Sequence, residues 1–348
     1  MINRTIWNFG RISLFCCLLA VCLENSAQSK HEKWTIRALE YNVENLFDCQ
    51  HDSLKQDFEF LPDGDYHWTP SKYWRKLNAV ARGIVLASSQ NGTFLPPDLI
   101  GLCEVENDSV IHSLVHRSLL RGAGYEYVMT NSPDERGVDV ALLYQPVSFR
   151  LISHYGLRVD PIEDMRPTRD ILYVKGEVLA SSDTADVATL PLHVFVVHAP
   201  SRRGGEQASR PFRLAVMQRM LQSVDSLRAT DANARIIVMG DFNDYAGNAS
   251  LKLLSSAGFT DVSAAPYITK DKKVKGTYKY QGEWGSLDHI LISEPLMSNF
   301  SRSFITYDPE MLEDDEKYGG VKPYRFFRGP IVNGGYSDHL PLLLELNM

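Results

Sequence analysis

The chain has 348 residues and a formal net charge of −7 at pH 7, from 36 Lys and Arg against 43 Asp and Glu. Non-specific binding to nucleic acid depends mainly on Lys and Arg that neutralise phosphates, so an acidic chain is a weak candidate for that class of protein. The charge does not exclude a phosphate-bearing substrate, because a bound divalent cation would supply local positive charge. Only Cys49 and Cys103 lie beyond the first 27 residues, which excludes a small disulfide-stapled scaffold.

The N-terminal segment has the layout of a secretory signal peptide. Basic Arg4 and Arg11 come first, an apolar run follows over residues 12–23, and small and polar residues come next. The apolar run is too short for a transmembrane helix, which needs about 20 residues. We therefore expect cleavage after Ala27.

Removal of residues 1–27 would leave a single domain over residues 28–348. The protein would then be secreted or periplasmic, with no transmembrane segment after the signal is removed. An uncleaved membrane anchor is one alternative. A lipid anchor on Cys22 is another, although Val21 is a poor residue to precede a lipidated cysteine.

Short apolar runs rich in Val, Ile and Leu recur along the rest of the chain, each bounded by polar or turn-forming residues. Runs of this kind predict buried β-strands. We expect strands over residues 34–41, 98–103, 138–144, 192–197, 235–239, 287–292 and 340–346. Polar clusters stand at the ends of these runs, so we look for a site there.

Two segments between the predicted strands have the spacing of amphipathic helices. Thr69 and Pro70 suit the cap and first turn of a helix, and apolar residues then recur at steps of four and three up to Ala87. Apolar residues from Leu214 to Val224 repeat this spacing. Buried strands alternating with helices favour an α/β fold. Several strands with few helices between them point to two packed sheets flanked by helices rather than to a doubly wound parallel sheet.

Carboxylates at the strand ends could bind a metal or activate water. Glu104 directly follows an apolar strand and suits a hard oxygen ligand for Mg²⁺, with Glu106 close behind as the alternative. Gly240 allows a turn, and Asp241 and Asn243 would point to the same side of an extended chain. Asp241 could then activate water while Asn243 donates to developing charge. Each residue taken alone also fits an ordinary strand end or turn.

Two histidines stand at strand ends together with acids that could orient them. Asp338 and His339 come just before the last strand, and Asp288 enters another strand as a candidate partner for His339. His198 ends a further strand, and we expect Asp139 to be its partner. An imidazole oriented by a carboxylate can protonate a leaving group or hold a phosphoryl oxygen. A lone histidine is more often structural, but two with nearby acids favour a site.

Motifs for several other mechanisms are absent. The sequence has no Cys-x-x-Cys or His-Glu-x-x-His pattern for zinc, no Gly-x-Ser-x-Gly elbow and no P-loop.

Asn42 ends the first predicted strand and could offer its amide to a metal or a phosphate, or simply cap the strand. Carboxylates, amides and two imidazoles suit metal-assisted attack of water on a phosphoester.

Taken in order, the polar clusters resemble the endonuclease/exonuclease/phosphatase superfamily, which has the DNase I-like fold. The clusters that carry the resemblance cover residues 41–45, 102–104, 137–143, 197–200, 240–243, 287–291 and 337–341. They extend over nearly all of the chain after the signal segment. Any one cluster is weak evidence, but seven in the family's order are strong.

The resemblance implies an α/β (α+β) fold, a four-layer helix–sheet–sheet–helix sandwich with the site at one rim of the two sheets. It implies that Asn42 and Glu104 hold a divalent metal, Mg²⁺ or Mn²⁺, with Asp338 near it. The metal is therefore expected to bind to side chains from three separate parts of the chain.

The resemblance also implies roles in catalysis. Asp241 would orient or activate the attacking water, and Asn243 would bind the scissile phosphate. His339, paired with Asp288, would contact that phosphate. His198, paired with Asp139, would be the second imidazole that contacts the phosphate.

Charged and aromatic residues near these clusters suggest contacts with the rest of a substrate. Arg202 and Arg203 follow a strand end in a Gly-rich loop and could clamp a non-scissile phosphate, with Arg166 and Arg169 as weaker candidates. A solvated charged loop is the plainer interpretation. Aromatic residues between positions 278 and 284 could stack on a base or pack the loop against the fold.

We therefore expect a secreted, Mg²⁺-dependent phosphodiesterase, an endonuclease that hydrolyses nucleic acid by direct attack of water. Similarity of residues 41–47 and 280–285 to secreted bacterial nuclease-like members favours nucleic acid as the substrate. A phosphatase or phospholipase C-like enzyme acting on a sugar phosphate, inositol phosphate or sphingomyelin head group is the alternative within the fold. A non-catalytic binding module is the alternative from another class. No stable protein partner is expected.

Overall fold

Residues 34–179, 189–263 and 273–348 are described by the structure, a computed structural model. The predicted cleavage site after Ala27 and the alternative anchor at Cys22 lie outside these residues. Residues 35–348 form one compact unit. Within the described ranges, no helix is both long and apolar enough to cross a membrane.

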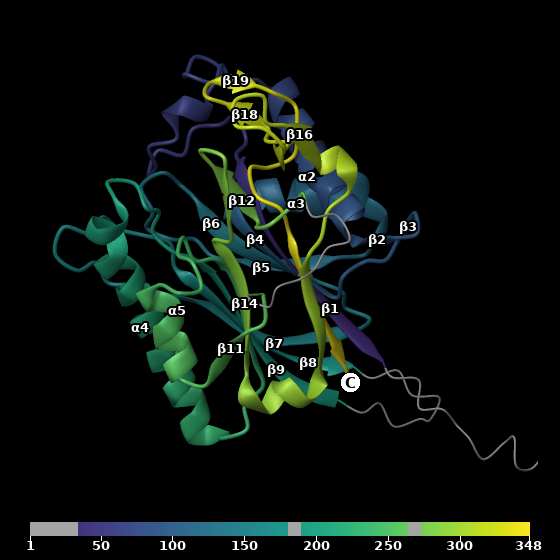
Figure 1. Cartoon of the computed structure of the whole chain (residues 1–348), viewed down its shortest axis with the longest axis vertical. Helices are drawn as coiled ribbons and strands as arrows, with labels where there is room; N and C mark the ends of the chain where they lie inside the picture. Colours follow the sequence, from purple (N-terminus) through teal and green to yellow (C-terminus); the bar gives the residue numbers. More distant parts are fainter. Residues whose placement is uncertain (1–33, 180–188, 264–272) are drawn as a thin grey trace, which may run out of the picture. The chain divides into compact units, whose positions relative to one another are not determined.

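Two six-stranded sheets lie face to face (Figure 1). The first sheet has the strand order β15 (Phe300–Ile305), β20 (Leu342–Asn347), β1 (Thr35–Leu46), β4 (Leu99–Val105), β6 (Asp139–Tyr144) and β5 (Glu126–Met129). The second has the order β11 (Phe259–Asp261), β14 (Asp288–Ser293), β10 (Ile236–Asp241), β9 (Thr189–His198), β8 (Ile171–Leu179) and β7 (Phe149–Leu157). All seven predicted strands are present.

Helices cover the outer face of each sheet. The helices are α2 (Pro70–Ser88) and α3 (Asp108–Arg117) on the first sheet, and α4 (Glu206–Thr230) and α5 (Ala249–Ser256) on the second. Each pair shares one apolar core with its own sheet, and Figure 1 shows α4 and α5 on the side away from α2 and α3. The predicted mixed α/β fold, with helix–sheet–sheet–helix layers, is confirmed.

Short hairpins and 3₁₀ helices occupy the connections. The hairpins pair β2 (Ser89–Gln90) with β3 (Thr93–Phe94), β12 (Tyr278–Tyr280) with β13 (Glu283–Gly285), β16 (Leu312–Asp314) with β17 (Val321–Pro323), and β18 (Phe327–Arg328) with β19 (Ile331–Val332). The 3₁₀ helices are Phe58–Phe60, Leu119–Gly122, Glu294–Asn299 and Pro309–Met311. The apolar runs did not predict five strands of the two sheets. One of them, β8, lies inside the second sheet between β7 and β9, and its run is interrupted by exposed Lys175 and half-buried Glu177. The other four, β5, β7, β11 and β15, are sheet edges. Edge strands expose more side chains to water, and this interrupts the apolar pattern.

The two sheets approach closely where small residues face the opposite sheet. A Cβ on Gly101 of β4 would lie 3.0 Å from Met239 Sδ of β10. Cys103 Sγ, also on β4, donates to the Val197 carbonyl of β9 at 3.4 Å. Close packing of this kind leaves little room for sliding, so the polar residues that end these strands are held at a fixed separation.

The helix predicted after Thr69 is present and begins at Pro70. The buried face of α4 differs from its predicted stripe, because Leu214 and Leu221 are only half buried. Arg213 is instead fully buried, with its Nε 2.8 Å from Asp244 Oδ1. A charged residue at a buried position breaks the apolar spacing, which explains the shifted face.

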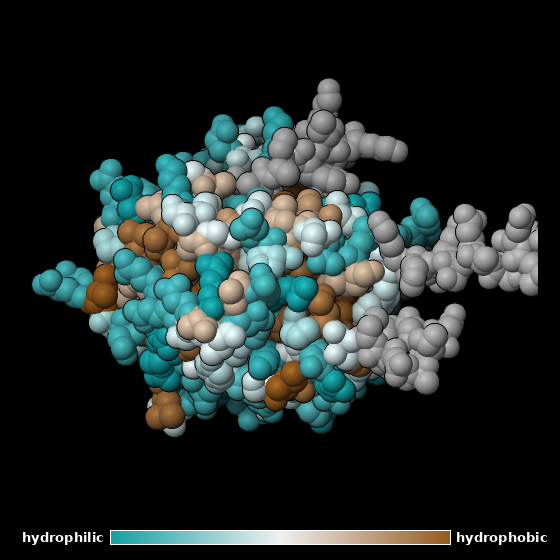
Figure 2. Space-filling view, turned by 90° about the horizontal axis from the view of Figure 1, so that it is seen from below, coloured by the Kyte–Doolittle hydropathy of each residue, from teal (hydrophilic) through white to brown (hydrophobic). Residues whose placement is uncertain are grey.

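Figure 2 shows the face of the molecule that is lowest in Figure 1. Hydrophobic residues lie there in small groups, separated by hydrophilic residues. Scattered apolar side chains are ordinary on the surface of a folded domain, so these groups mark no particular site.

Candidate active site

Side chains from both sheets line a cavity of about 660 Å³ at the ends of the central strands. Eight of the predicted site residues line it: Glu104, His198, Arg202, Arg203, Asp241, Asn243, Asp338 and His339. Asn42 and Asp288 are buried behind the wall, where they hydrogen bond to two of the lining residues. Asp139 forms its hydrogen bonds elsewhere.

The backbone leaves regular strand geometry where several of these side chains project. Glu104 has a φ of 67°, and the register of β4 with β6 shifts at this position. Glu44 and Asn45 have φ values of 54° and 55°, where the pairing of β1 with β4 shifts after Asn42. Irregular pairing re-aims side chains, and left-handed backbone at non-glycine residues concentrates at functional sites.

Asp241 ends β10 directly after Gly240, whose φ is 143°. A Cβ on Gly240 would lie 1.8 Å from the Val197 carbonyl oxygen of β9, so only glycine fits there. Asp241 Oδ1 accepts a hydrogen bond from the Asn243 backbone N at 2.8 Å. Its Oδ2 accepts one from Asn42 Nδ2 at 3.0 Å. The glycine and the two bonds fix the carboxylate in place.

Asn243 holds Asp241 through its side chain as well. Asn243 Nδ2 donates to the Ala199 carbonyl at 3.1 Å and to Asp241 Oδ2 at 3.3 Å. Both side-chain hydrogens are thus directed at the protein, so binding a phosphate would require one of these bonds to be exchanged. Burial, together with repulsion from Asp288, raises the pKa of Asp241 to about 7. A carboxyl group with such a pKa suits a general base near neutral pH.

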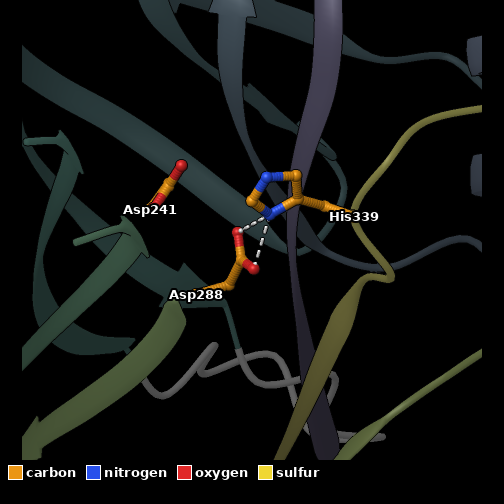
Figure 3. A group of neighbouring side chains, drawn as sticks. All are labelled: Asp241, Asp288 and His339. Carbon is orange, nitrogen blue, oxygen red and sulfur yellow. Dashed lines mark hydrogen bonds and ion pairs between the residues drawn. The ribbon is translucent and has the colours of Figure 1, made fainter. Parts of the chain in front are cut away.

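The predicted pair of His339 and Asp288 is formed in the structure (Figure 3). Nδ1 of His339 lies 2.8 Å from Asp288 Oδ2 and 3.0 Å from Oδ1. Burial lowers the pKa of His339, but the charge and hydrogen bond of Asp288 outweigh it and raise that pKa well above its ordinary value. The imidazole is therefore protonated, and Nδ1 donates to the carboxylate. Nε2, which lies 4.0 Å from Asp338 Oδ1, is available to a substrate.

The second imidazole, His198, lies between two acids of the site. Its Nε2 is 3.8 Å from Glu104 Oε1 and 3.8 Å from Asp241 Oδ2. Burial, with nearby Arg169 and Arg136, lowers the pKa of His198 well below its ordinary value, so the ring is neutral. Its buried Nδ1 forms no hydrogen bond within the described part of the chain.

Asp139 does not pair with His198, contrary to the prediction. Its carboxylate accepts hydrogen bonds from Thr130 Oγ1 and from the Ser132 backbone N, the latter at 3.1 Å. Thr130 directly follows β5, which pairs with β6, so Asp139 joins the neighbouring edge strand of its own sheet. Strand-end position alone could not distinguish this structural role from a catalytic one.

Two of the predicted metal ligands each keep an oxygen atom or lone pair available. Glu104 Oε2 accepts a hydrogen bond from the Asn45 backbone N at 2.9 Å, while Oε1 is free of a hydrogen bond with any described residue. Asn42 Oδ1 accepts from the Glu44 backbone N at 3.0 Å, which leaves its second lone pair. Carboxylate and amide oxygens are the donors that Mg²⁺ prefers, so this donor set fits the ion.

The third predicted ligand, Asp338, is oriented by an arginine that sequence reasoning missed. Arg325 Nη2 lies 3.0 Å from Asp338 Oδ2 and 3.0 Å from Glu44 Oε1. Glu44 is buried and also accepts a hydrogen bond from the Phe326 backbone N at 2.6 Å. The sequence held one signal for this contact. Glu44 is an acid within residues 41–45, the first cluster that carries the family resemblance, and a buried acid needs a partner.

Asp241, Asp288 and His339 form a different group that could hold an ion (Figure 3). One ligand atom from each lies within 4.8 Å of the others. Asp288 and His339 already bind each other, however, with Nδ1 of the histidine 2.8 Å and 3.0 Å from the two carboxylate oxygens. The donors on Asn42 and Glu104 therefore suit Mg²⁺ better.

Arginines and tyrosines form the outer wall of the cavity. The guanidinium of Arg202 lies 4.7 Å from the ring centroid of Tyr245, an aromatic residue that sequence reasoning did not single out. Tyr278 packs against the ring of His339 at 4.9 Å, and Tyr280 is 60% exposed at the rim. The aromatic residues predicted between positions 278 and 284 are Tyr278, Tyr280 and Trp284, and Trp284 packs against the core of the first sheet. Tyr278 and Tyr280 line the cavity, as does Tyr245.

Comparison with known proteins gives one family and a set of similar folds. A model of the endonuclease/exonuclease/phosphatase family matches residues 38–348. Curated protein sequences give no match.

Three solved structures illustrate the shared fold. An endonuclease/exonuclease/phosphatase family protein from Bacteroides thetaiotaomicron has 17% identity, covers 90% of this chain and 98% of its own, and gives a TM-score of 0.54. A mannosyl-6-phosphatase from Bacteroides thetaiotaomicron VPI-5482 has 16% identity, with 90% and 100% coverage and a TM-score of 0.52. Truncated TDP2 from Caenorhabditis elegans has 16% identity, with 90% and 98% coverage and a TM-score of 0.51.

Proposed function

The chain belongs to the endonuclease/exonuclease/phosphatase family, and we propose that it is a secreted, Mg²⁺-dependent phosphodiesterase that cleaves nucleic acid. Phosphoester hydrolysis is the chemistry of this family. The observation that carries the proposal is the meeting of Asp241, His198 and Glu104 in one cavity, with Nε2 of the histidine 3.8 Å from both acids. Secretion rests on the signal-like layout of residues 1–27.

Asp241 is the residue that we assign to activation of water. Its carboxylate is held by Asn42 and Asn243, and burial raises its pKa to about 7. A base held in this way accepts a proton from water as the oxygen attacks phosphorus. The bond from phosphorus to the leaving oxygen then breaks, so no covalent intermediate with the protein is needed.

The two imidazoles have different protonation states, and this suits different tasks. His339, protonated and fixed by Asp288, donates from Nε2 to the phosphate or the leaving oxygen. His198 is neutral and turns Nε2 toward the cavity acids, where it positions a phosphoryl oxygen.

Asn42, Glu104 and Asp338 would hold the divalent ion, for the donor chemistry described above. When bound, the ion supplies positive charge against the charges of the phosphate and the leaving oxygen. The wall residues Arg202, Arg203 and Tyr280 support nucleic acid as the substrate, because guanidinium groups bind phosphates and aromatic rings stack on bases.

Purified protein without residues 1–27 tests the proposal on plasmid DNA, RNA, a bis-aryl phosphodiester, an aryl monoester and lipid head groups. EDTA and Asp241→Asn should each abolish turnover, and exposed Asp225→Asn on α4 is the matched control with the same change in charge. Cleavage that persists with EDTA and with Asp241→Asn would overturn the metal mechanism. Turnover of the monoester or lipid head groups without turnover of diesters would replace the nuclease with a phosphatase or phospholipase. No turnover with saturating Mg²⁺ and Mn²⁺ would favour a binding module.

A further inference from the structure

A second cavity of about 470 Å³ adjoins the candidate active site. Arg136, Arg169, Ser201 and Arg203 line both cavities, so the two are neighbouring parts of one groove. The catalytic acids and both imidazoles line only the first cavity. The second cavity therefore lies beside the reacting phosphate and holds none of the catalytic machinery.

The deeper acid of the second cavity is satisfied within the protein. Asp134 is buried and lies 3.1 Å from Arg169 Nη1, and its Oδ1 accepts a hydrogen bond from the Arg136 backbone N at 3.0 Å. Arg169 also donates to the Ala199 carbonyl at 3.0 Å. Arg169 and Asp134 thus anchor the loops of the groove to each other, while the buried Nε of Arg169 has no hydrogen-bond partner among the described residues.

The two arginines at the junction are exposed and weakly partnered. Arg203 forms no side-chain hydrogen bond or ion pair with any residue that the structure describes. Arg136 Nε reaches only to 4.0 Å from Asp134 Oδ1. The other acids of the cavity are Asp164 and Glu135, and Glu135 lies 3.8 Å from Arg166. Positive charge therefore remains at the junction after the internal pairs are counted.

The wall of the second cavity combines apolar and unsatisfied polar groups. Met165, Pro167 and Phe212 provide apolar surface. Thr168, which is buried in the same wall, has an Oγ1 with no hydrogen-bond partner among the described residues. Cations at the entrance with an apolar wall and a spare hydroxyl match the parts of a nucleotide: phosphate, base and sugar.

We propose that this groove binds the nucleotide next to the scissile bond, with Arg203 and Arg136 on its phosphate. This inference rests on the proposed function and deepens it, because it makes the substrate a chain of phosphodiesters rather than a single phosphoester. Binding of this second phosphate determines which phosphodiester bond of the nucleic acid lies over Asp241 and His339. The substrate must therefore have at least one nucleotide beyond the cleaved bond, on the side of that bond that faces Arg203.

The test compares kcat/KM for a fluorescent single-stranded 12-mer with kcat/KM for bis(p-nitrophenyl) phosphate. Arg203→Ala and Arg136→Ala should lower the ratio of the two values at least ten-fold. Arg203→Lys, which keeps the charge, should restore part of it. Arg117→Ala, at the exposed end of α3 and outside both cavities, is the matched control. Loss of one phosphate contact should also reduce the slope of log affinity against log salt by about 0.7.

Three outcomes would contradict the groove. The ratio could stay constant in Arg203→Ala because both substrates lose equally, which would place Arg203 on the scissile phosphate. The ratio could stay constant because kcat/KM is unchanged for both substrates, which would show that Arg203 does not contact the substrate. The unaltered protein could also cleave the single diester as efficiently as the 12-mer, and the phosphodiesterase would then stand without the groove. If the unaltered protein cleaves no diester, the proposed function fails with it.

Discussion

Arg325 bridges Asp338 and Glu44, donating to Asp338 Oδ2 at 3.0 Å and from Nε to Glu44 Oε1 at 3.1 Å. The backbone N of Glu44 in turn donates to Asn42 Oδ1 at 3.0 Å. One arginine thus links two of the three proposed metal ligands, which lie nearly 300 positions apart in the chain. Residues that orient ligands in this way commonly change metal affinity or activity 10- to 100-fold, roughly, when they are removed.

Arg325→Ala should therefore lower kcat/KM by about 10- to 100-fold and raise the Mg²⁺ concentration that gives half-maximal activity. Titration of activity against Mg²⁺ measures both changes. Arg328→Ala is the matched control, because Arg328 lies in the same segment and pairs at the surface with Glu313. Equal behaviour of the two variants would show that Arg325 has no special role.

Asp288→Asn should lower kcat by roughly 10²- to 10⁴-fold, the range for loss of general acid–base catalysis. The amide has no charge to hold His339 protonated, so Nε2 loses the proton that it would donate. Steady-state kinetics give kcat, and the melting temperature reports whether the buried site still folds. Exposed Asp314→Asn provides the comparison. A kcat within three-fold of the unaltered protein would remove the pair from the mechanism.

His289, next to Asp288, is a structural cation, and its contribution to stability should depend on pH. Nδ1 lies 2.8 Å from Asp261 Oδ2 and Nε2 lies 2.9 Å from the Asp244 carbonyl, so both nitrogens must carry hydrogens. Burial lowers the pKa of His289, but the hydrogen bond and charge of Asp261, with Asp288 nearby, raise it above its ordinary value.

Because the folded pKa is raised, the stabilisation is fully present below the unfolded pKa of about 6.5 and is lost as pH rises through the folded pKa. His289→Gln should thus cost about 1.5–3 kcal/mol near pH 6 and less near pH 9. Chemical denaturation at the two pH values measures the difference. The same cost at both would mean that the ring is neutral in the folded state. Exposed His116→Gln should change neither value.

Gly285→Ala should disturb the tyrosine that supports Arg202. A Cβ on Gly285 would lie 2.4 Å from Tyr245 Cε1, so the ring must move and leave the guanidinium that stacks on it. Loss of a cation–π contact of roughly 0.5–1 kcal/mol predicts a rise of about three-fold in KM for nucleic acid. Gly247→Ala, where an added Cβ meets no atom within 4 Å, is the control. An unaltered KM in Gly285→Ala would separate Tyr245 from substrate binding.

The sequence was enough to predict the layers of the fold and most members of the cavity. Apolar runs identify strands that are buried on both faces, and the internal strands of both sheets are of that kind except β8, whose run is interrupted by Lys175 and Glu177. The edge strands escaped because their exposed side chains lack the pattern; β7, for example, exposes most of its residues. His339 and Asp288 could be paired because each stands next to a strong strand signal.

The partners that sequence reasoning missed are fixed by tertiary contacts. Asp139 has the strand position expected of an orienting acid, but Thr130 and Ser132 lie close enough to take its hydrogen bonds. Arg325 reaches Glu44 across 281 positions of sequence, and no spacing rule relates the two. Such pairings depend on how connections cross the ends of the sheets, which local patterns do not encode.

The close approach of the two sheets at Gly101, where an added Cβ would meet Met239, has a consequence for when activity can arise. Asn42 and Glu104 stand on one sheet, whereas His198 and Asp241 stand on the other. Either sheet formed alone would carry acids but no complete hydrolytic centre. Turnover therefore reports packing of the two sheets against each other rather than formation of secondary structure. A chain whose sheets had formed but not yet packed together would not hydrolyse phosphoesters.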